Sequence, residues 1–316
     1  MSPGASLSRT GLAAALTLLA GLATVPFWGT GYGIAFSLLL LVSAGLALSW
    51  NLISGLTGYV SFGHAAFFGS GAYAAALLIT DLHWHWLPAS FAGGCLAAAL
   101  ALPVGAILLR LKGAFFAVSM LGLAEILRYL TGQWSSLTGG GKGVYLPPVN
   151  TLTAVYFVIL GVTATVFAVT SYILRHPMGV KLRAIRDDEV AARCLGVDTT
   201  RLKVLAFVLS AFFPGVLGGL YGWYVTYIEP DSVFNAGISL NMLVMTFFGG
   251  AGTLWGPVVG AALLEVVKEY LWATLPSVYM IIFGVLLVLN IVVLPKGLVV
   301  WLGARGRPAV REAAGL

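Results

Sequence analysis

The sequence predicts an all-α fold: a polytopic transmembrane helical bundle with broken or re-entrant helices and one charged cytoplasmic loop. Of the 316 residues, 59% are apolar and 9% are charged, far below the roughly 25% charged residues of soluble domains. The mean hydropathy is +0.98. Eleven of the 28 charged residues (17 Lys and Arg plus 11 Asp and Glu) fall in the 29 positions of residues 175–203. We therefore expect a single transmembrane domain over residues 1–316 with a soluble loop at about 175–203.

Apolar runs of about 20 residues, the length of a bilayer-spanning helix, follow one another along the chain. In chain order the expected spans are 11–28, 34–53, 61–80, 88–109, 114–131, 152–174, 204–228, a broken pair at 238–249 and 253–272, and 278–294. The first is interpreted as a retained span, because Val25, Pro26, Phe27 and Trp28 make a poor signal cleavage site.

The positions of the basic residues predict the orientation of the spans. With the N-terminus in the cytoplasm and the broken pair counted as one in-and-out hairpin, only Arg128, Lys142 and Lys268 of the 17 Lys and Arg do not fall inside, as the positive-inside rule requires. We expect a multi-pass protein of the inner (plasma) membrane with both termini cytoplasmic. The net charge of +6 is accounted for by these basic residues, which lie in short loops beside the spans and orient them in the membrane. No nucleic-acid partner is therefore expected.

Two glycine-rich interruptions break the apolar runs. Segment 238–249 is only about 18 Å long, too short for a hydrocarbon core of about 30 Å, and predicts a half-helix followed by the turn GGAGTLWGP at 249–257. A similar break lies in 51–73 around Gly55, Gly58 and Gly63. Broken backbone at membrane depth must face protein or a watery cavity.

Paired breaks of this kind are typical of translocation paths, and an ordinary surface loop is the alternative at each break. The side chains and backbone expected to line such a path are Asn51, Ser61, His64, Gly249, Gly250 and Gly252.

Glycines also predict close helix packing. Gly252, Gly256 and Gly260 repeat at four-residue spacing, which lets helices approach each other in lipid. The pairs within 215–222 are not distinguished from chance in a chain with 40 glycines.

The charged loop carries a helical pattern. Leu182, Ile185, Glu189, Ala192 and Leu195 recur at helical spacing and predict a short amphipathic helix. Gly196 is placed to end it, and Asp198 or Thr199 to cap the next helix. We call residues 175–203 the knob, and its compact shape suits a groove on another protein.

Three blocks of the chain resemble a known family. They are NLISGLTGYVSFGHAAFFGSGAYAAALL (51–78), MGVKLRAIRDDEVAARCLGVDTTRLK and its continuation (178–222), and FFGGAGTLWGPVVGA (247–261). Together they resemble LivM-type permeases of bacterial branched-chain amino acid ABC transporters, from about residue 38 to 296.

The resemblance implies a permease subunit that translocates leucine, isoleucine and valine across the inner membrane and is not itself an enzyme. It also implies the partners: a second permease subunit of the LivH type, two cytoplasmic ATPases of the LivG and LivF type, and a periplasmic solute-binding protein. No cofactor is expected.

Glu189, Val190, Ala191 and Ala192, followed by Gly196, resemble the Glu-Ala-Ala coupling loop of ABC permeases, with a departure at Val190. The residues expected to couple the chain to the ATPase are Leu182, Ile185, Arg186, Asp187, Asp188, Glu189, Ala192 and Gly196. The apolar members, with Leu195, are expected to supply the buried contact, and the charges to set orientation. A solvated topology anchor is the alternative.

Other chemistry finds little support. SLTGGGKG at 136–143 lacks the first glycine and the final hydroxyl of a phosphate-binding loop and is interpreted as a mobile external loop, which could touch the delivering protein. His83 and His85 supply only two ligands, so no metal site is expected. No catalytic constellation is present.

Ionisable residues within spans form two groups, Glu125 with Arg128, and Glu265 with Lys268 and Glu269. We interpret both as lying toward the outer ends of their spans, as structural pairs or contacts with the second permease in preference to a substrate site. Two alternatives to the main function stay open: a same-family permease for urea, short amides or other amino acids, and a stand-alone ion-driven secondary transporter.

Overall fold

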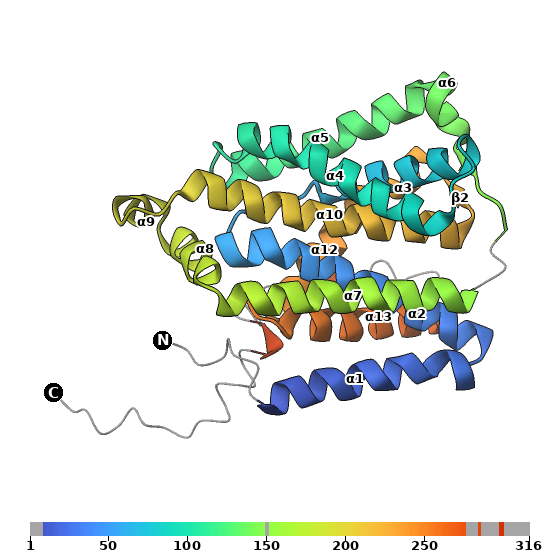
Figure 1. The fold of residues 1–316 in the computed structure, drawn as a ribbon, viewed down its shortest axis with the longest axis horizontal. Coiled ribbons are helices and arrows are strands. Elements are labelled where there is room, and N and C mark those ends of the chain that lie inside the picture. The colour runs from blue at the N-terminus through green and yellow to red at the C-terminus, as the bar shows by residue number, and fades with distance from the viewer. Residues whose placement is uncertain (1–8, 149–151, 276–283, 286–296, 300–316) are drawn as a thin grey trace.

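The computed structural model describes residues 9–148, 152–275, 284–285 and 297–299, and confirms an all-α membrane-type bundle (Figure 1). The long helices are α1 Arg9–Trp28, α2 Gly31–Trp50, α3 His64–Thr80, α4 Trp86–Leu108, α5 Ala114–Gln133, α7 Leu152–Arg175, α10 Thr199–Val225, α12 Ala236–Gly249 and α13 Gly256–Thr274. Each coincides with an expected span to within a few residues, whereas almost all of the expected span 278–294 lies outside the described residues.

Six elements of the described chain are long and apolar enough to cross a membrane. They are Gly31–Gly55, Trp86–Leu108, Ala114–Gln133, Leu152–Arg175, Thr199–Val225 and Pro230–Gly249. The first contains α2 and a π-helical turn, η1 Asn51–Gly55, and the last contains α11 Pro230–Val233 and α12.

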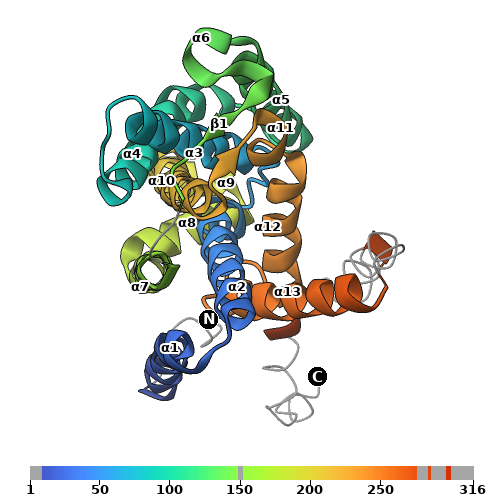
Figure 2. The same cartoon turned by 90° about the vertical axis from the view of Figure 1, so that its right-hand side faces the viewer.

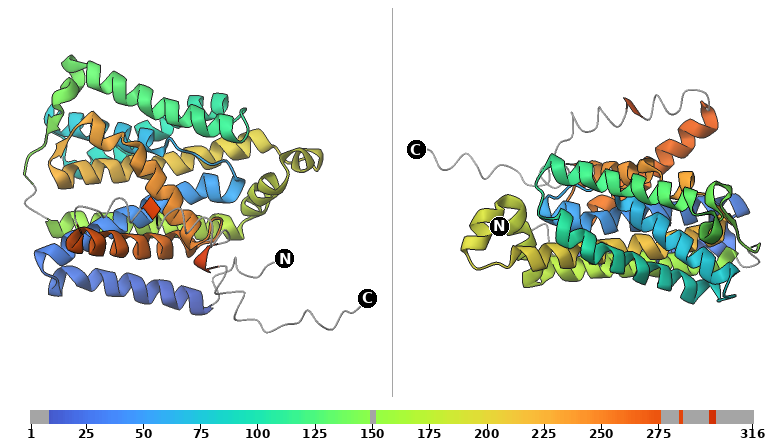
Figure 3. Two further views of the ribbon diagram at one scale, coloured as in Figure 1. Left: turned by 180° about the vertical axis from the view of Figure 1, so that it is seen from behind. Right: turned by 90° about the horizontal axis from the view of Figure 1, so that it is seen from above.

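The knob projects from one end of the bundle as two short helices, α8 Pro177–Asp187 and α9 Glu189–Cys194. They extend beyond the ends of the other described helices in both views of Figure 3. We call this the knob end.

At the opposite end, which we call the strand end, β1 Val144–Tyr145 pairs antiparallel with β2 Tyr227–Ile228. The segment before β1, expected to be a mobile loop, forms α6 Ser135–Thr138 and a 3₁₀ turn, η2 Gly140–Lys142. The strand pairing fixes it to the end of α10.

The centre of the bundle is a tightly packed trio of α3, α4 and α10. A Cβ atom at Gly71 of α3 would lie 2.2 Å from the carbonyl oxygen of Gly215 on α10, and one at Gly218 would lie 2.1 Å from that of Phe68. Hydrogen is the only side chain that fits at these crossings. The α10 glycine pairs, which the sequence did not distinguish from chance, thus form real packing contacts.

Helices α12 and α13 form a hairpin whose turn faces the knob end. Its position follows from its contact with the knob: a Cβ atom at Gly252 would lie 2.6 Å from the Nη1 atom of Arg186 on α8. Both helices are seen largely from the side in Figure 2, so they are tilted relative to α10. The predicted turn exists, and α12, with 14 residues, is the predicted short helix. α11 precedes it after a break at Phe234 and Asn235, and the two together make up a 20-residue candidate span.

Close glycine packing holds the hairpin together, as predicted for Gly256 and Gly260. A Cβ atom at Gly260 would lie 1.8 Å from the carbonyl oxygen of Met245, and one at Gly249 would lie 1.7 Å from that of Gly256. The two helices therefore cross with their backbones in contact.

Candidate functional site

The knob owes its shape to three helix caps. His176 caps α8, with Pro177 in its first turn. Asp188 ends α8 and caps α9, its side chain accepting hydrogen bonds from the backbone N–H groups of Val190 and Ala191 at 2.7 and 3.0 Å. Gly196, with φ +81°, ends α9 in the left-handed conformation that glycine favours.

The next helix begins where the sequence predicted, with Asp198 as the cap of α10 through the N–H group of Arg201 at 3.1 Å.

The apolar face of the knob is turned toward the chain's own bundle. Leu182, Ile185 and Ala192 are 0%, 3% and 2% exposed. They are therefore not available to contact an ATPase directly, and that part of the expectation is corrected.

Leu195 is 84% exposed and Val190 is 61% exposed. The physical reason is that the helix breaks at Asp188 and α9 ends at Cys194. The sequence pattern treated 182–195 as one continuous helix, whereas Leu195 lies after the last turn of α9 and does not share the buried face of Ala192. The apolar side chains that face outward are instead Val180, Val190 and Leu195.

The first of two polar joints attaches α8 to the first break. The guanidinium Nη1 of Arg186 donates a hydrogen bond of 2.7 Å to the carbonyl oxygen of Gly55, the last residue of η1. A π-helical turn leaves carbonyl groups outside the usual helical pairing, so this oxygen is open to a side-chain donor. A Cβ atom at Gly58 would lie 3.2 Å from the Cγ atom of Arg186, which leaves little room for a side chain there.

The second joint is a buried ionic cluster around Glu189 and Lys203. The Lys203 ammonium lies 2.8 Å from Oε1 of Glu189 and also donates to the hydroxyl of Tyr59 and the carbonyl of Leu109, both at 2.9 Å. Tyr59 donates to the other carboxylate oxygen of Glu189 at 2.6 Å. The side chains of Lys203 and Glu189 are only 5% and 9% exposed, and the three ammonium protons each have an acceptor, as a buried charge requires.

Electrostatics within this cluster favour a charged carboxylate and a neutral phenol. Burial alone would raise the pKa of the Glu189 carboxyl, but the hydrogen bonds from Lys203 and Tyr59 and the charge of Lys203 outweigh it and hold the pKa below its ordinary 4.5. Burial, followed by the hydrogen bond and the charge of Glu189, raises the pKa of the Tyr59 phenol above its ordinary value.

The two predicted breaks contact each other at η1, next to the joint that Arg186 makes with Gly55. The Asn51 amide donates to the carbonyl oxygen of Thr253 at 3.0 Å and accepts from the N–H group of Gly252 at 2.7 Å. Asn51 is fully buried. The α12–α13 turn is thus pinned to η1, which in turn holds Arg186.

The other expected path residues lie elsewhere in the interior. His64 and Ser61 are fully buried; Nδ1 of His64 lies 2.8 Å from the Oγ atom of Ser61, and Nε2 lies 3.2 Å from the Oγ atom of Ser210. Gly249 and Gly250 are buried at the hairpin turn. The structure brings Asn51 and Gly252 together in one set of hydrogen bonds and Ser61 and His64 in another. The lining role of all six residues stays a prediction.

Sequence reasoning missed one set of residues and misjudged the position of another. The first set is the ionic cluster: Lys203 was counted only as a basic residue that orients the spans, and Tyr59 was not named as a site residue. The available sign was the position of Lys203, a lysine directly before an apolar run. The second set surrounds a cavity of about 200 Å³ between α2, α12 and α13.

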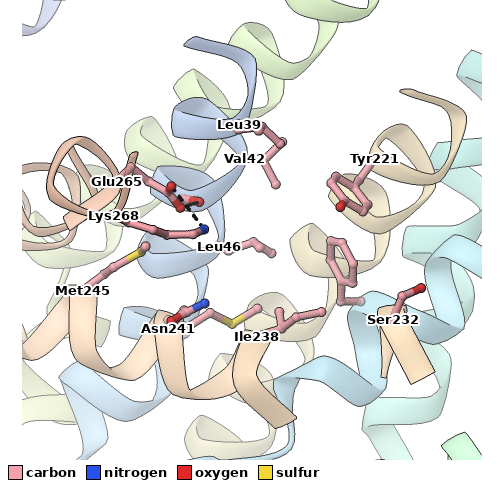
Figure 4. Close-up of a pocket in the computed structure, with 13 residues that line it drawn as sticks. Leu39, Val42, Leu46, Tyr221, Ser232, Ile238, Asn241, Met245, Glu265 and Lys268 are labelled. Atoms are coloured by element: carbon pink, nitrogen blue, oxygen red, sulfur yellow. Dashed lines mark hydrogen bonds and ion pairs between the residues drawn. The ribbon is translucent and has the colours of Figure 1, made fainter. Parts of the chain in front are cut away.

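Figure 4 shows Glu265 and Lys268 beside this cavity, with Leu46, Met245 and Asn241 near them. Glu265 is 7% exposed. Its Oε1 atom accepts from the hydroxyl of Ser43 at 2.6 Å, so Glu265 does not lie at the outer end of its span as expected. The pairing of Glu125 with Arg128 is confirmed, at 2.8 Å.

Comparison with known proteins gives the family. The model described as "Branched-chain amino acid transport system / permease component" matches residues 33–291. The high-affinity branched-chain amino acid transport system permease proteins LivM of Salmonella typhimurium and Escherichia coli are each 31% identical over 287 residues, covering 80% of this chain and 66% of the relative. The corresponding LivH protein of Salmonella typhimurium is 26% identical over 297 residues, covering 84% of this chain and 92% of the relative.

The chain therefore spans about 66% of the length of its two LivM relatives. No solved structure matches it. The match over 33–291 shows that this chain belongs to the family of permease components of branched-chain amino acid transport systems.

Proposed function

We propose that the chain is the transmembrane permease subunit of an ABC importer and translocates branched-chain amino acids without catalysing chemistry itself. The observation that carries this proposal is the knob: two short helices tied by Arg186 and Glu189 to the first break, which lies in 51–73. A permease that hydrolyses no ATP must receive work mechanically, through an element that moves with its ATPase. The names of the LivM and LivH relatives support the cargo.

The partners in this proposal are a second permease of the LivH type, two ATPases of the LivG and LivF type and a periplasmic solute-binding protein. The knob end faces the cytoplasm, because the basic residues of the loops gather there. Val180, Val190 and Leu195, exposed on the knob, supply the apolar contact with the ATPase. The exposed carboxylates of Asp187 and Asp188 orient it.

In this proposal the route of force follows the polar joints. A displacement of the knob moves η1 through Arg186 and the loop after it through Glu189. Asn51 passes the displacement on to the α12–α13 turn. The Glu189–Lys203 joint and Asn51 are buried, and closely packed interiors deform little, so these contacts transmit strain.

Reconstitution into liposomes tests the proposal. Liposomes that hold the chain with the second permease and both ATPases, supplied with binding protein outside and ATP inside, should accumulate radiolabelled leucine. Liposomes that hold the chain alone should not. Leucine flux by the chain alone that an uncoupler abolishes would instead show an ion-driven secondary transporter.

Competition in the same preparation identifies the cargo. Unlabelled isoleucine and valine should suppress leucine uptake, whereas urea and short amides should not. Suppression of leucine uptake by urea or short amides, and not by isoleucine or valine, would show that the chain transports another solute.

A further inference from the structure

We propose that the cavity between α2, α12 and α13 is a binding site for the free zwitterionic amino acid during its passage, with Glu265 and Lys268 holding the charged head. This inference rests on the proposed function and adds to it the place where the solute binds and the residues that bind it. The cavity lies beside Ser43, Asn241, Glu265 and Lys268 on its polar side (Figure 4).

The charged residues of the cavity lie at mid-depth in the bundle. Glu265 bonds to Ser43 at 2.6 Å, and Ser43 has 12 residues on either side within the 25-residue apolar element Gly31–Gly55. Ionisable groups at the centre of a bilayer are costly, and they face a cavity or a pathway in most membrane proteins. Glu269, one turn further along α13, bonds to Tyr32 near the start of α2 and lies at the outer end of the same helix.

The geometry of the pair leaves hydrogen-bonding capacity for a ligand. The Nζ atom of Lys268 lies 3.4 Å from Oε2 of Glu265, and that is the one polar contact it makes among the described residues. An ammonium group has three donors, and the Lys268 side chain is 42% exposed and is one of the residues that line the cavity. Lys268 can therefore donate to a substrate carboxylate while Glu265 accepts from a substrate ammonium.

The rest of the lining suits an aliphatic side chain. The apolar residues are contributed by three elements: Leu39, Val42 and Leu46 from α2, Phe68 from α3, and Ile238, Met242 and Met245 from α12. A volume of about 200 Å³ is below the roughly 300–1,000 Å³ of sites for drug-sized ligands. The combination of a polar pair and a small apolar wall matches a small amino acid with a branched hydrocarbon side chain.

The lining of the cavity extends toward the strand end, and two of its walls are connected to the knob. Its lining reaches Tyr221, near the end of α10, and Ser232 of α11, both toward the strand end. Its α12 and α13 walls are joined by the turn that Asn51 pins to η1. Displacement of the knob would therefore alter the cavity directly.

A purely structural ion pair is the competing explanation, and the chain contains an example of one. Glu125 and Arg128 are also three residues apart on one helix, but they are 2.8 Å from each other, 47% and 39% exposed, and Arg128 reaches Asp231 as well. Neither residue of that pair lines the cavity between α2, α12 and α13. The Glu265–Lys268 pair is longer, more buried on the carboxylate side and borders empty space.

Photolabelling locates the bound solute. The reconstituted complex of both permeases, both ATPases and the binding protein is irradiated with a diazirine analogue of leucine, and the adducts are mapped by mass spectrometry. Adducts are expected on α2 and α12 around Val42, Leu46 and Met242, and excess leucine should remove them. Leucine-protected adducts confined to other segments, such as the surroundings of His64, would overturn the inference.

Matched substitutions test the roles of the charged pair and the apolar wall. Lys268→Gln and Glu265→Gln should each reduce leucine uptake about tenfold or more, the effect of losing one hydrogen bond to a charged group. Glu269→Gln, on the same helix outside the cavity, should retain uptake. Val42→Trp fills the cavity without changing any charge and should also abolish uptake, whereas Leu40→Trp, which lines a different groove on α2, should not.

The outcomes separate the inference from the function on which it rests. Normal uptake by Lys268→Gln and by Val42→Trp would show that the pair is structural and the cavity unused, while the wild-type complex still transports leucine. Absence of uptake by the wild-type complex would overturn the proposed function, and the site would fall with it.

Discussion

Lys203 illustrates how one buried charge can hold a whole surface element in place. Its ammonium group is shared between the knob, the loop after η1 and the end of α4. Removing one member of a buried ion pair leaves the other charge unpaired in a poorly hydrated site. The joint should therefore depend strongly on this single side chain.

We expect Lys203→Met to destabilise the attachment of the knob by about 3 kcal/mol. Limited proteolysis of the loop 175–203 in the purified protein measures this as faster cleavage. Arg201→Met is the matched control, since its ion pair with Asp198 is 89% and 52% exposed and contributes no more than about 1 kcal/mol. Equal cleavage rates for the two variants would contradict the role of the cluster.

The same cluster predicts a dependence on acid. The pKa of Glu189 is lowered from 4.5, so its contribution to stability is present above about pH 4.5 and is lost as the pH falls below it. The rate of knob cleavage by an acid-tolerant protease should rise in that range. Glu189→Gln should remove this pH dependence of cleavage. The same pH profile in the variant as in the wild-type protein would argue against assigning the dependence to Glu189.

Single residues were the least predictable level of the structure. The spacing of Leu182, Ile185 and Ala192 correctly identified an apolar face, but spacing alone does not say whether that face meets a partner or the chain's own bundle. The depth of Glu265 was misjudged because span boundaries from hydropathy are uncertain by several residues. Contacts such as that of Glu189 with Tyr59 join positions 130 apart and leave no local pattern.

Helices, by contrast, were largely predictable. In lipid a spanning segment must satisfy its backbone hydrogen bonds within itself and is therefore helical, and its apolar side chains appear in the sequence as a long apolar run. The caps at Asp198 and Gly196 and the turn after α12 follow from residue type. The spacing of Gly256 and Gly260 predicted the close packing of α12 on α13, but the crossing of α3 and α10 depends on glycines whose neighbours are distant in sequence, and the sequence did not reveal it.

The crossing of α3 and α10 makes that dependence testable. Gly218→Ala places a methyl group against the backbone of Phe68 and should destabilise the bundle by about 1–3 kcal/mol, measured as a lower Tm in detergent. Gly161→Ala on α7, where a Cβ atom meets nothing within 4 Å, should leave Tm unchanged or raise it. A similar Tm for both variants would contradict the packing described.

For the whole molecule, the orientation of the bundle follows from the side on which the knob lies. Cys194 is exposed on α9. In a Cys95→Ser background, a membrane-impermeant maleimide should label it in inside-out vesicles and not in intact cells. Labelling from outside would reverse the orientation and remove the ATPase from reach of the knob.

The central claim is that the knob transmits ATP-driven motion through its joints to the membrane helices, and the number of leucine molecules imported per ATP hydrolysed tests it most directly. In the reconstituted complex, Arg186→Gln, which removes the joint to Gly55, should lower this ratio several-fold while ATP hydrolysis continues. Arg201→Gln should retain the wild-type ratio. An unchanged ratio in Arg186→Gln would contradict the account.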